Sequence, residues 1–334
     1  MRARLLIIYV LNSNFDLFFL KKNYLCKMKK LVVLLLVVSS FVSTAQDPHF
    51  SQVYTSSMYL NPALTGALTG WVSNAQYRNQ WPKIKGHRTV NLGLQKGLDS
   101  NKLGFGITIL NDNAGNSIYT TALGVNAAKR WDLGDVVELG LGIGSQFYQK
   151  SVDFTSLTFG DMIDNKLGFI SDSTSKDNIS TINLVNFSVG IDLKIFNGNV
   201  GFTTSNLFEP NESFIGTTSK LPRRYTIYGK YEFNFAENWF ITPLVKYENQ
   251  SSFDQALFGG STRYKFVLLF IGYRSEDALI LGAGVNFERI RFNYSFDVTT
   301  SRIGHNSTGG SHEVGFIFRF GGGAAGYDKM HFSF

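Results

Sequence analysis

The stretch Ile290-Arg291-Phe292-Asn293-Tyr294-Ser295-Phe296-Asp297-Val298 alternates strictly between apolar and polar side chains. Because successive side chains on a β-strand point to opposite faces, this stretch predicts a strand with one apolar face and one polar, charged face. The segment just before it, Leu279–Glu288, repeats the alternation. The two stretches together predict neighbouring strands that both have unlike faces.

The same alternation recurs along most of the chain. It predicts about 14 strands, at residues 71–80, 88–97, 102–111, 118–131, 136–150, 183–196, 199–207, 222–235, 239–249, 253–264, 267–274, 278–288, 290–298 and 312–320. The register is ambiguous only over 253–274. A length of about nine to eleven residues lets a tilted strand cross a bilayer. Apolar side chains facing lipid and polar side chains facing an enclosed interior are typical of outer-membrane barrels. We therefore predict an all-β fold: a transmembrane outer-membrane β-barrel of about 14 antiparallel strands over residues 71–320, preceded by an irregular N-terminal segment.

The connections between the predicted strands alternate in length. The short set includes residues 133–135, the Asn197-Gly198-Asn199 turn and residues 236–238, and the long set includes residues 151–182, 208–221 and 299–311. Asn-Gly is a strong signal for a tight hairpin. Outer-membrane barrels have short periplasmic turns and longer extracellular loops, so the alternation supports an even number of strands.

The two ends of the chain differ from the predicted barrel. Residues 28–45 have the form of a signal peptide, with a basic start, a short apolar run and Ser43-Thr44-Ala45 before the expected cut. Residues 1–27 precede that pattern and are interpreted as an upstream extension that is not part of the natural start. Residues 321–334 form a glycine-rich C-terminal extension. A signal peptide on a barrel predicts export to the outer membrane of a Gram-negative cell.

The charge of +7 does not describe the barrel. Seven basic residues and one acidic residue lie within residues 1–45, which leaves the rest of the chain nearly neutral. The sequence therefore gives no support for nucleic-acid binding. The single cysteine, Cys26, also precedes the expected cut, so the mature chain can form no disulfide.

Residues 46–70 contain two prolines and many small polar residues, which predicts an irregular segment that lies in the periplasm or plugs the barrel. The predicted inner face mixes both signs of charge, at Arg78, Glu138, Asp192, Lys194, Lys230, Glu232, Arg291, Asp297 and Arg319. A selective pore usually gathers one sign. Mixed charges favour pairing across a filled lumen, and glycines at positions 140, 142, 144, 282 and 284 would let a plug approach the wall.

Several motifs, spread in order over the chain, resemble the PorP/SprF family of Bacteroidetes outer-membrane proteins. They include Gln46-Asp47-Pro48-His49-Phe50-Ser51-Gln52, Leu60-Asn61-Pro62-Ala63, Tyr77-Arg78-Asn79-Gln80-Trp81-Pro82, Leu157–Asp161, Pro222-Arg223-Arg224-Tyr225-Thr226 and Gly309-Gly310-Ser311-His312-Glu313. The resemblance implies a membrane barrel of the type IX secretion and gliding machinery. It implies secretion components and adhesin-type cargo as protein partners, in addition to outer-membrane lipid.

The residues expected to contact a partner or a plug come from these motifs. They are Asp47, Pro48, Phe50, Ser51, Gln52, Asn61, Pro62, Tyr77, Arg78, Asn79, Gln80, Trp81, Arg223, Arg224, His312 and Glu313. The same Tyr77–Pro82 and Arg223-Arg224 stretches would suit a headgroup boundary instead. His312 and Glu313 are expected to make loop-to-strand contacts.

No catalytic motif, cofactor site or metal site is predicted, because the five histidines are scattered and no nucleophile motif occurs. The expected function is a non-enzymatic scaffold or anchor for the export or surface attachment of adhesin-like cargo. The alternative is a passive channel or a transporter for hydrophobic substrates. A surface hydrolase built on Ser311 and His312 is a third possibility that lacks a plausible triad.

Overall fold

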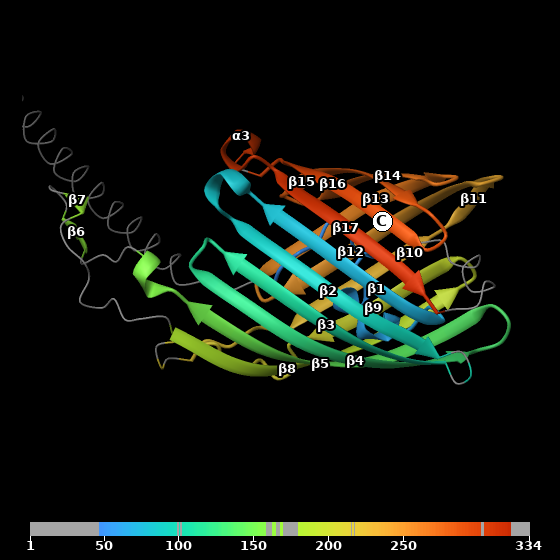
Figure 1. Cartoon of the computed structure of the whole chain (residues 1–334), viewed down its shortest axis with the longest axis horizontal. Coiled ribbons are helices and arrows are strands. Elements are labelled where there is room, and N and C mark those ends of the chain that lie inside the picture. Colours follow the sequence, from blue (N-terminus) through green and yellow to red (C-terminus); the bar gives the residue numbers. More distant parts are fainter. Residues whose placement is uncertain are drawn as a thin grey trace, which may run out of the picture. The chain divides into compact units, whose positions relative to one another are not determined.

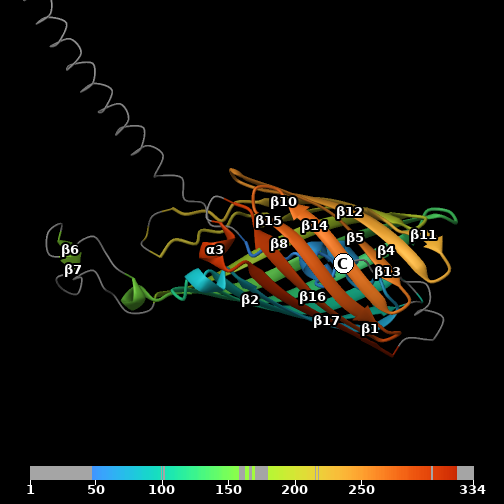
Figure 2. The same ribbon diagram turned by 90° about the horizontal axis from the view of Figure 1, so that it is seen from above.

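A computed structural model describes residues 47–98, 100, 102–157, 162–164, 168–169, 180–214, 216, 218–301 and 304–321. Fourteen antiparallel strands close into a barrel (Figures 1 and 2). They are β1 Gly70–Gln80, β2 His87–Leu98, β3 Leu103–Ala114, β4 Ile118–Asp132, β5 Val137–Val152, β8 Ser180–Ile195, β9 Gly198–Ser205, β10 Arg224–Tyr231, β12 Trp239–Gln250, β13 Phe253–Tyr264, β14 Val267–Arg274, β15 Ala278–Asn286, β16 Ile290–Thr299 and β17 Ser311–Phe320. A short strand, β11 Phe233–Ala236, continues β10. The predicted fold class is confirmed.

The barrel closes through the first and last strands. β1 pairs with β17 from Trp71 opposite Phe320 to Gln80 opposite Ser311, and β10 pairs with β12 on the other side of the ring. Each remaining strand pairs with its neighbours along the chain, so consecutive connections lie at opposite ends of the barrel. We call the end at which β8 joins β9 the turn end, and the opposite end the loop end.

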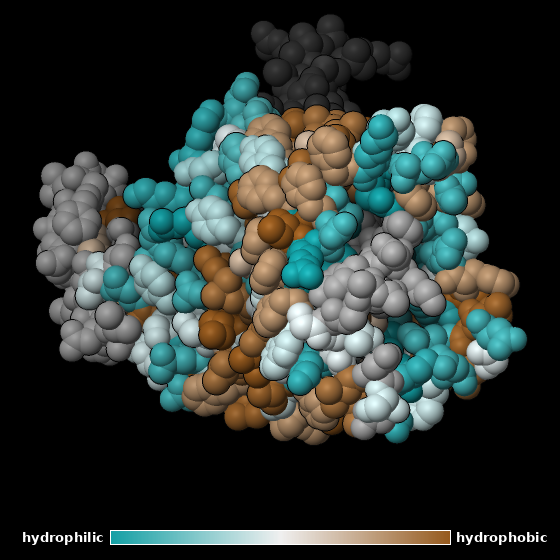
Figure 3. All heavy atoms as spheres, turned by 45° about the vertical axis from the view of Figure 1, so that its right-hand side comes forward, coloured by the Kyte–Doolittle hydropathy of each residue, from teal (hydrophilic) through white to brown (hydrophobic). Residues whose placement is uncertain are grey.

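The two faces of the wall are as the alternation predicts. In β16 the side chain of Phe292 is 45% exposed, whereas Arg291 and Asn293 on the inner face are 2% and 0% exposed. A water-soluble sheet buries its apolar row, so this reversed arrangement requires a nonpolar solvent around the barrel. Hydrophobic side chains are visible on the outer wall in Figure 3. No helix within the described ranges is long and apolar enough to cross a membrane.

Some boundaries differ from the sequence prediction. The expected Asn-Gly turn lies one residue earlier, because Phe196 and Asn197 form the two-residue connection and Gly198 already belongs to β9. Phe196 takes the left-handed conformation there, with φ of 51°. The strand expected over 222–235 begins at Arg224 and is interrupted at Glu232, whose N–H donates to Asn197 O. β5 and β8 are 16 residues long, well beyond what a bilayer crossing needs.

Short elements lie between the strands and before them. They are α2 Ser57–Leu60, η1 Pro62–Leu64, η2 Pro82–Ile84, η3 Phe154–Ser156, α3 His305–Thr308 and the paired strands β6 Ile163–Asp164 and β7 Gly168–Phe169. Within η1, Pro62 stands at the first position, where its missing N–H costs nothing. The Asn61 side chain caps this turn by accepting from Ala63 N at 2.8 Å.

Residues 47–69, which we call the N-terminal segment, run inside the barrel. Ser51, Gln52 and Asn61 are fully buried, and the segment lies within the ring of strands in both ribbon views (Figures 1 and 2). Its apolar side chains Val53, Tyr54, Leu60 and Leu64 form one cluster with inward residues of β10 and β12–β15: Tyr228, Leu244, Leu257, Leu268, Phe270 and Ile280. The barrel interior therefore holds a packed core around this segment.

Five expectations lie outside the described residues: the upstream extension 1–27, the signal peptide 28–45, Gln46 at the start of the predicted irregular segment, residues 158–161 of the motif that begins at Leu157, and the C-terminal extension beyond Gly321.

Candidate functional site: contacts of the N-terminal segment with the barrel wall

The Glu313 carboxylate, on the inner face of β17, binds the N-terminal segment at its Ser51-Gln52 peptide. Its Oε2 accepts from Ser51 N and from Arg78 Nη1, both at 2.8 Å. Its Oε1 accepts from Gln52 N at 2.8 Å and from Gln76 Nε2 at 2.7 Å. All four donors are buried with it, so this carboxylate is fully satisfied without water.

Two arginines balance the charge of this contact. Arg78 Nη2 lies 2.7 Å from Asp297 Oδ2, and Arg274 Nη2 lies 3.1 Å from the same oxygen. Ser51 Oγ donates to Asp297 Oδ2 at 2.8 Å and accepts from Arg78 Nη1 at 2.7 Å and from Arg274. Buried charges are tolerated only when they are paired and hydrogen-bonded, as they are here. We call Arg78, Arg274, Asp297 and Glu313 the charged cluster.

A second contact holds the start of the segment near the loop end. Asp47 Oδ2 lies 3.4 Å from Arg224 Nη1 and accepts from Asn206 Nδ2 at 3.1 Å. Arg224 also donates to the Tyr59 hydroxyl at 2.9 Å and stacks on its ring, and that hydroxyl donates to Pro48 O at 2.6 Å. The segment thus folds back on itself around one arginine of the wall.

His49 lies between these two contacts. Its Nδ1 is 3.1 Å from Glu248 Oε2, and Lys246 Nζ lies 2.8 Å from the same carboxylate oxygen. Burial lowers the pKa of the His49 imidazole, and the nearby Lys246 and Arg224 lower it further, while Glu248 acts in the opposite direction. A neutral imidazole is therefore favoured in the docked segment.

The third contact is a close approach of backbones at Asn61-Pro62. Asn61 Nδ2 donates to Ile191 O at 2.9 Å and to the Tyr228 hydroxyl at 3.1 Å. Opposite this turn the wall carries Gly142 and Gly190, and a Cβ at either would collide with it. Only glycine leaves room for such an approach.

The prediction that wall glycines admit a plug holds for some positions. Gly140 and Gly142 face Ala63 of the segment, whereas a Cβ at Gly144 would meet Asn126, and one at Gly284 would meet Asn293 of the neighbouring strand. The segment also approaches the wall at glycines that the sequence reasoning did not name: Gly93, Gly97, Gly104, Gly106, Gly190 and Gly315.

The structure divides the sequence-predicted site residues into two groups. Those that meet in the lumen are Asp47, Pro48, Phe50, Ser51, Gln52, Asn61, Pro62, Arg78, Arg224 and Glu313. Phe50 packs edge-on against Tyr59 and belongs to a small cluster with Leu110 and Ala122.

The other predicted residues lie on the outer wall or at the loop-end rim. Tyr77 is exposed on the outer face and Asn79 follows it on the same side, while Gln80 ends β1 and Trp81 begins the connection after it. Trp81 N donates to Gly310 O at 3.0 Å, which joins two loops of the rim. Arg223 is exposed and donates to Leu207 O. Its side chain therefore lies on the outside of the barrel, whereas that of Arg224 points into the lumen.

The pair at positions 312 and 313 is divided between the two faces of β17. His312 faces outward, where its Nδ1 lies 2.8 Å from the Tyr294 hydroxyl, whereas Glu313 faces the lumen. Neighbouring residues on a strand point to opposite faces, so these two side chains cannot act together. Ser311 likewise points inward, away from His312.

Sequence reasoning missed several residues of the lumen contacts. Arg274 lies in the stretch of ambiguous register, and Asn206, which the alternation placed in the strand expected over 199–207, lies just after the end of β9. Glu248 and Lys246 alternate with Val245 and Tyr247 in β12, so the alternation itself could have placed them inside. Among the described residues, no group of three His, Cys, Asp or Glu side chains could hold a metal ion.

Comparison with known proteins adds a family to this geometry. The family described as "Type IX secretion system membrane protein PorP/SprF" matches residues 42–318. No curated protein sequence matches the chain.

Among solved structures, the chain is similar at low sequence identity to a channel, a transporter and an outer-membrane protein. The CymD monoaromatic hydrocarbon channel has a TM-score of 0.47 at 9% identity, covering 80% of this chain and 94% of that one. The Ralstonia pickettii toluene transporter TbuX has a TM-score of 0.46 at 10% identity, with 81% and 98% covered. Omp33 of Acinetobacter baumannii has a TM-score of 0.43 at 8% identity, with 77% and 100% covered. Such similarity concerns the fold alone.

Proposed function

The chain belongs to the PorP/SprF family of type IX secretion system membrane proteins, and on that premise we propose that it is a non-enzymatic scaffold or anchor of the secretion and gliding machinery. In this role the barrel sits in the outer membrane with its lumen filled by the N-terminal segment. The loop-end rim engages secretion components or adhesin-like cargo. Export or surface attachment of the cargo then takes place beside the barrel.

The observation that carries this proposal is the set of contacts between the segment and the wall. Ser51, Gln52 and Asn61 are fully buried, and each is hydrogen-bonded to residues of the wall. An open channel needs a continuous wet path lined by groups that solutes can reach. A lumen filled by a packed, hydrogen-bonded segment suits a scaffold better than a pore.

The scaffold role predicts specific partners. The tagged full chain, expressed in its host and purified from the envelope in mild detergent, should recover type IX secretion components or sorting-domain cargo. A double variant at the rim, Trp81→Ala with Arg223→Ala, should lower this recovery. The matched control Trp239→Ala removes an exposed tryptophan near the turn end and should not lower it. Recovery of general porins only, from the unaltered chain, would reject the scaffold role.

The alternative is a passive channel or a transporter for hydrophobic substrates. Planar-bilayer conductance separates the two functions, because the full chain should be nearly silent if the segment fills the lumen. A variant lacking residues 46–66 should conduct. Steady conductance of the full chain, unchanged by that deletion, would favour the channel.

A further inference from the structure

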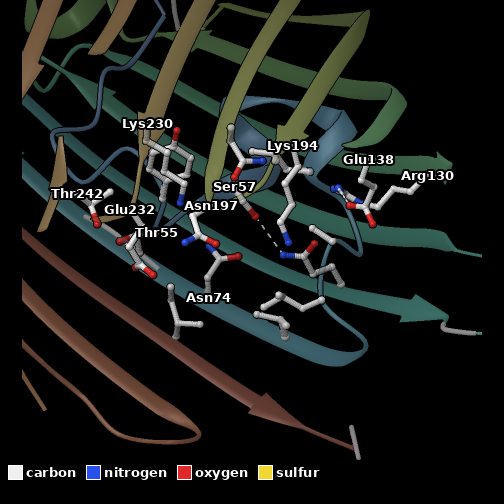
Figure 4. A pocket seen from close by; sticks show the side chains of 18 of the residues that line it. Thr55, Ser57, Asn74, Arg130, Glu138, Lys194, Asn197, Lys230, Glu232 and Thr242 are labelled. Atoms are coloured by element: carbon white, nitrogen blue, oxygen red, sulfur yellow. Dashed lines mark hydrogen bonds and ion pairs between the residues drawn. The ribbon is translucent and has the colours of Figure 1, made fainter. Parts of the chain in front are cut away.

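The cavity that remains beside the N-terminal segment is too small for a partner polypeptide. It has a volume of about 170 Å³, and its lining includes Ser57, Glu138 and Lys194 (Figure 4). Sites for drug-sized ligands have volumes of about 300–1,000 Å³. A protein partner therefore needs a surface outside this cavity, on the wall or the rim of the barrel.

The loop-end half of β8 offers such a surface, because it has a neighbouring strand on one side only. β5 pairs with all 16 residues of β8, whereas β9 pairs only with residues 189–195. The connection that follows β9 is drawn to the inner side of the wall, where Lys150 Nζ lies 2.7 Å from Glu212 Oε2. Within the described part of the chain, residues 180–188 therefore form an edge of the sheet.

The backbone groups of every second residue point away from β5 at this edge. Phe187 marks their direction, since its O accepts from Leu207 N at 3.1 Å and its N donates to Asn186 Oδ1 at 2.9 Å. The direction alternates along a strand, and the register between β8 and β5 is unbroken. The groups that lack a partner among the described residues are the N–H and C=O of Thr181, Asn183 and Val185. We call residues 181–185 the free edge.

The outward side chains indicate that the free edge reaches into water. Phe187 and Val185 are apolar and are 40% and 51% exposed, as expected of a wall that faces lipid. The next two outward residues toward the loop end, Asn183 and Thr181, are polar, and so is Gln149, which lies opposite Asn183 on β5. The apolar band therefore ends at Val185, and the strand continues beyond the bilayer.

The free edge lacks the features that protect sheet edges in water. Natural edges are blunted by charged side chains, prolines or bulges. Residues 180–188 contain no charged residue and no proline, and their unbroken register with β5 leaves no bulge. The inward side chains Ile182 and Leu184 are apolar and only partly buried. An unprotected edge with this alternation is suited to accept another strand.

We propose that the free edge binds an extended strand of a partner protein, which adds to the wall beside β8. The partner strand makes backbone hydrogen bonds with Thr181, Asn183 and Val185, and its inward apolar side chains lie beside Ile182 and Leu184. A second copy of the chain does not fit this role, because two barrels in one membrane have the same orientation and their β8 strands cannot run antiparallel. The inference rests on the proposed function and names the way in which the loop-end rim holds a secretion component or cargo.

A proline at position 183 tests the backbone contact. The N–H of Asn183 points away from β5, so Asn183→Pro keeps the hydrogen bonds between β5 and β8 and removes a donor of the free edge. Recovery of secretion components or sorting-domain cargo by the tagged full chain should fall at least about tenfold. The matched control Asn183→Ala changes the same side chain but keeps the N–H, and it should leave recovery unchanged. Heat-modifiable migration in gels checks that both variants are folded.

Hydrogen exchange of the purified full chain in detergent tests whether the edge is free. The amides of Asn183 and Val185 should exchange at least about a hundred times faster than those of Ile182 and Leu184, which pair with β5. Equally slow exchange at all four positions would mean that another part of the chain covers the edge, and it would overturn the proposal.

The remaining outcomes separate this inference from the proposed function. Unchanged recovery by folded Asn183→Pro, or an equal loss with Asn183→Ala, would overturn the strand addition and leave the scaffold role standing. Proline-sensitive recovery of an untagged second copy alone would also overturn it. Recovery of general porins only, by the unaltered chain, would instead reject the scaffold role and this inference with it.

Discussion

Replacing Glu313 by glutamine should release the N-terminal segment from the wall. Each carboxylate oxygen accepts from two donors: Ser51 N and Arg78 on Oε2, and Gln52 N and Gln76 on Oε1. Glutamine has nearly the same shape, but one of its two terminal atoms is an NH₂ group that donates. Flipping the amide does not help, because either orientation sets a donor against two donors.

The magnitude follows from this count. Two hydrogen bonds to a buried charged acceptor are lost, and each is worth about 1.5–3 kcal/mol. The substitution should therefore weaken docking by about 3–6 kcal/mol, while Arg78 keeps its ion pair with Asp297. Since each 1.4 kcal/mol is tenfold, the population of the released segment should rise by more than about a hundredfold.

Chymotrypsin reports that population. The segment offers cleavage sites at Phe50 and Tyr54, both only 5% exposed, so cleavage there requires release. When opening and closing are fast relative to cleavage, the cleavage rate follows the released population. The Glu313→Gln barrel, checked for folding by heat-modifiable migration, should be cut in the segment at least about a hundred times faster than the unaltered chain.

A matched control and a clear negative result define the test. Glu276→Gln removes an exposed carboxylate from the β14–β15 connection at the loop end and should leave the cleavage rate unchanged. If folded Glu313→Gln is cut no more than about twice as fast as the unaltered chain, Glu313 does not hold the segment. The charged cluster would then be a feature of the wall alone.

Three further changes probe other contacts of the segment. Gly142→Ala should speed chymotrypsin cleavage of the segment, because the added Cβ would collide with Ala63. The control Gly229→Ala should not, because a Cβ there would have no neighbour closer than 3.8 Å. Equal cleavage rates of the two variants would argue against the close approach of the segment to Gly142. Asn61→Ala removes the donor to Ile191 O and should lower the midpoint of thermal release, measured by protection from protease, by an amount worth about 1–3 kcal/mol. Burial lowers the pKa of His49 in the docked segment, so the released segment binds more protons. Docking should therefore weaken as pH falls through about 6.5, the ordinary pKa of histidine. The strength of docking should stop changing once the pH is below the pKa of His49 in the docked segment. Cleavage measured between pH 5 and 8 should show this slope, and His49→Gln should flatten it.

Alternation alone was enough to predict most of the strands and their faces. A lipid-facing wall leaves a period of two in the sequence, and this period appears in β16 and in β8 without help from other evidence. It could not reveal which inward charges meet. Arg78 pairs with Glu313 only because the first and last strands close the ring, and the two residues lie 235 positions apart. That register depends on closure of the whole barrel.

The ambiguous register over 253–274 has a physical cause in the structure. Leu257, Leu268 and Phe270 point inward but are apolar, because there the wall packs against Tyr54 and Leu60 of the N-terminal segment. When both faces of a strand are apolar, the period-two signal weakens, as it does in any strand that is covered on both sides. Arg274 is therefore hidden at the end of an apolar run. A sequence prediction that had already placed the N-terminal segment inside the barrel could have resolved the register over 253–274.

Because the inner wall packs against the N-terminal segment, deleting the segment does more than empty the lumen. Without residues 47–69, the inward apolar patch that includes Phe270 and Ile280 would face water, at a cost of about 25 cal/mol for each Å² exposed. Asp297 and Glu313 would at the same time lose the donors that Ser51 and Gln52 supply. A deletion variant is therefore a destabilised barrel as well as an emptied one, and its conductance mixes both effects. Glu313→Gln keeps the apolar packing of the segment and removes only its polar attachment, so the cleavage assay isolates the interaction that fills the lumen.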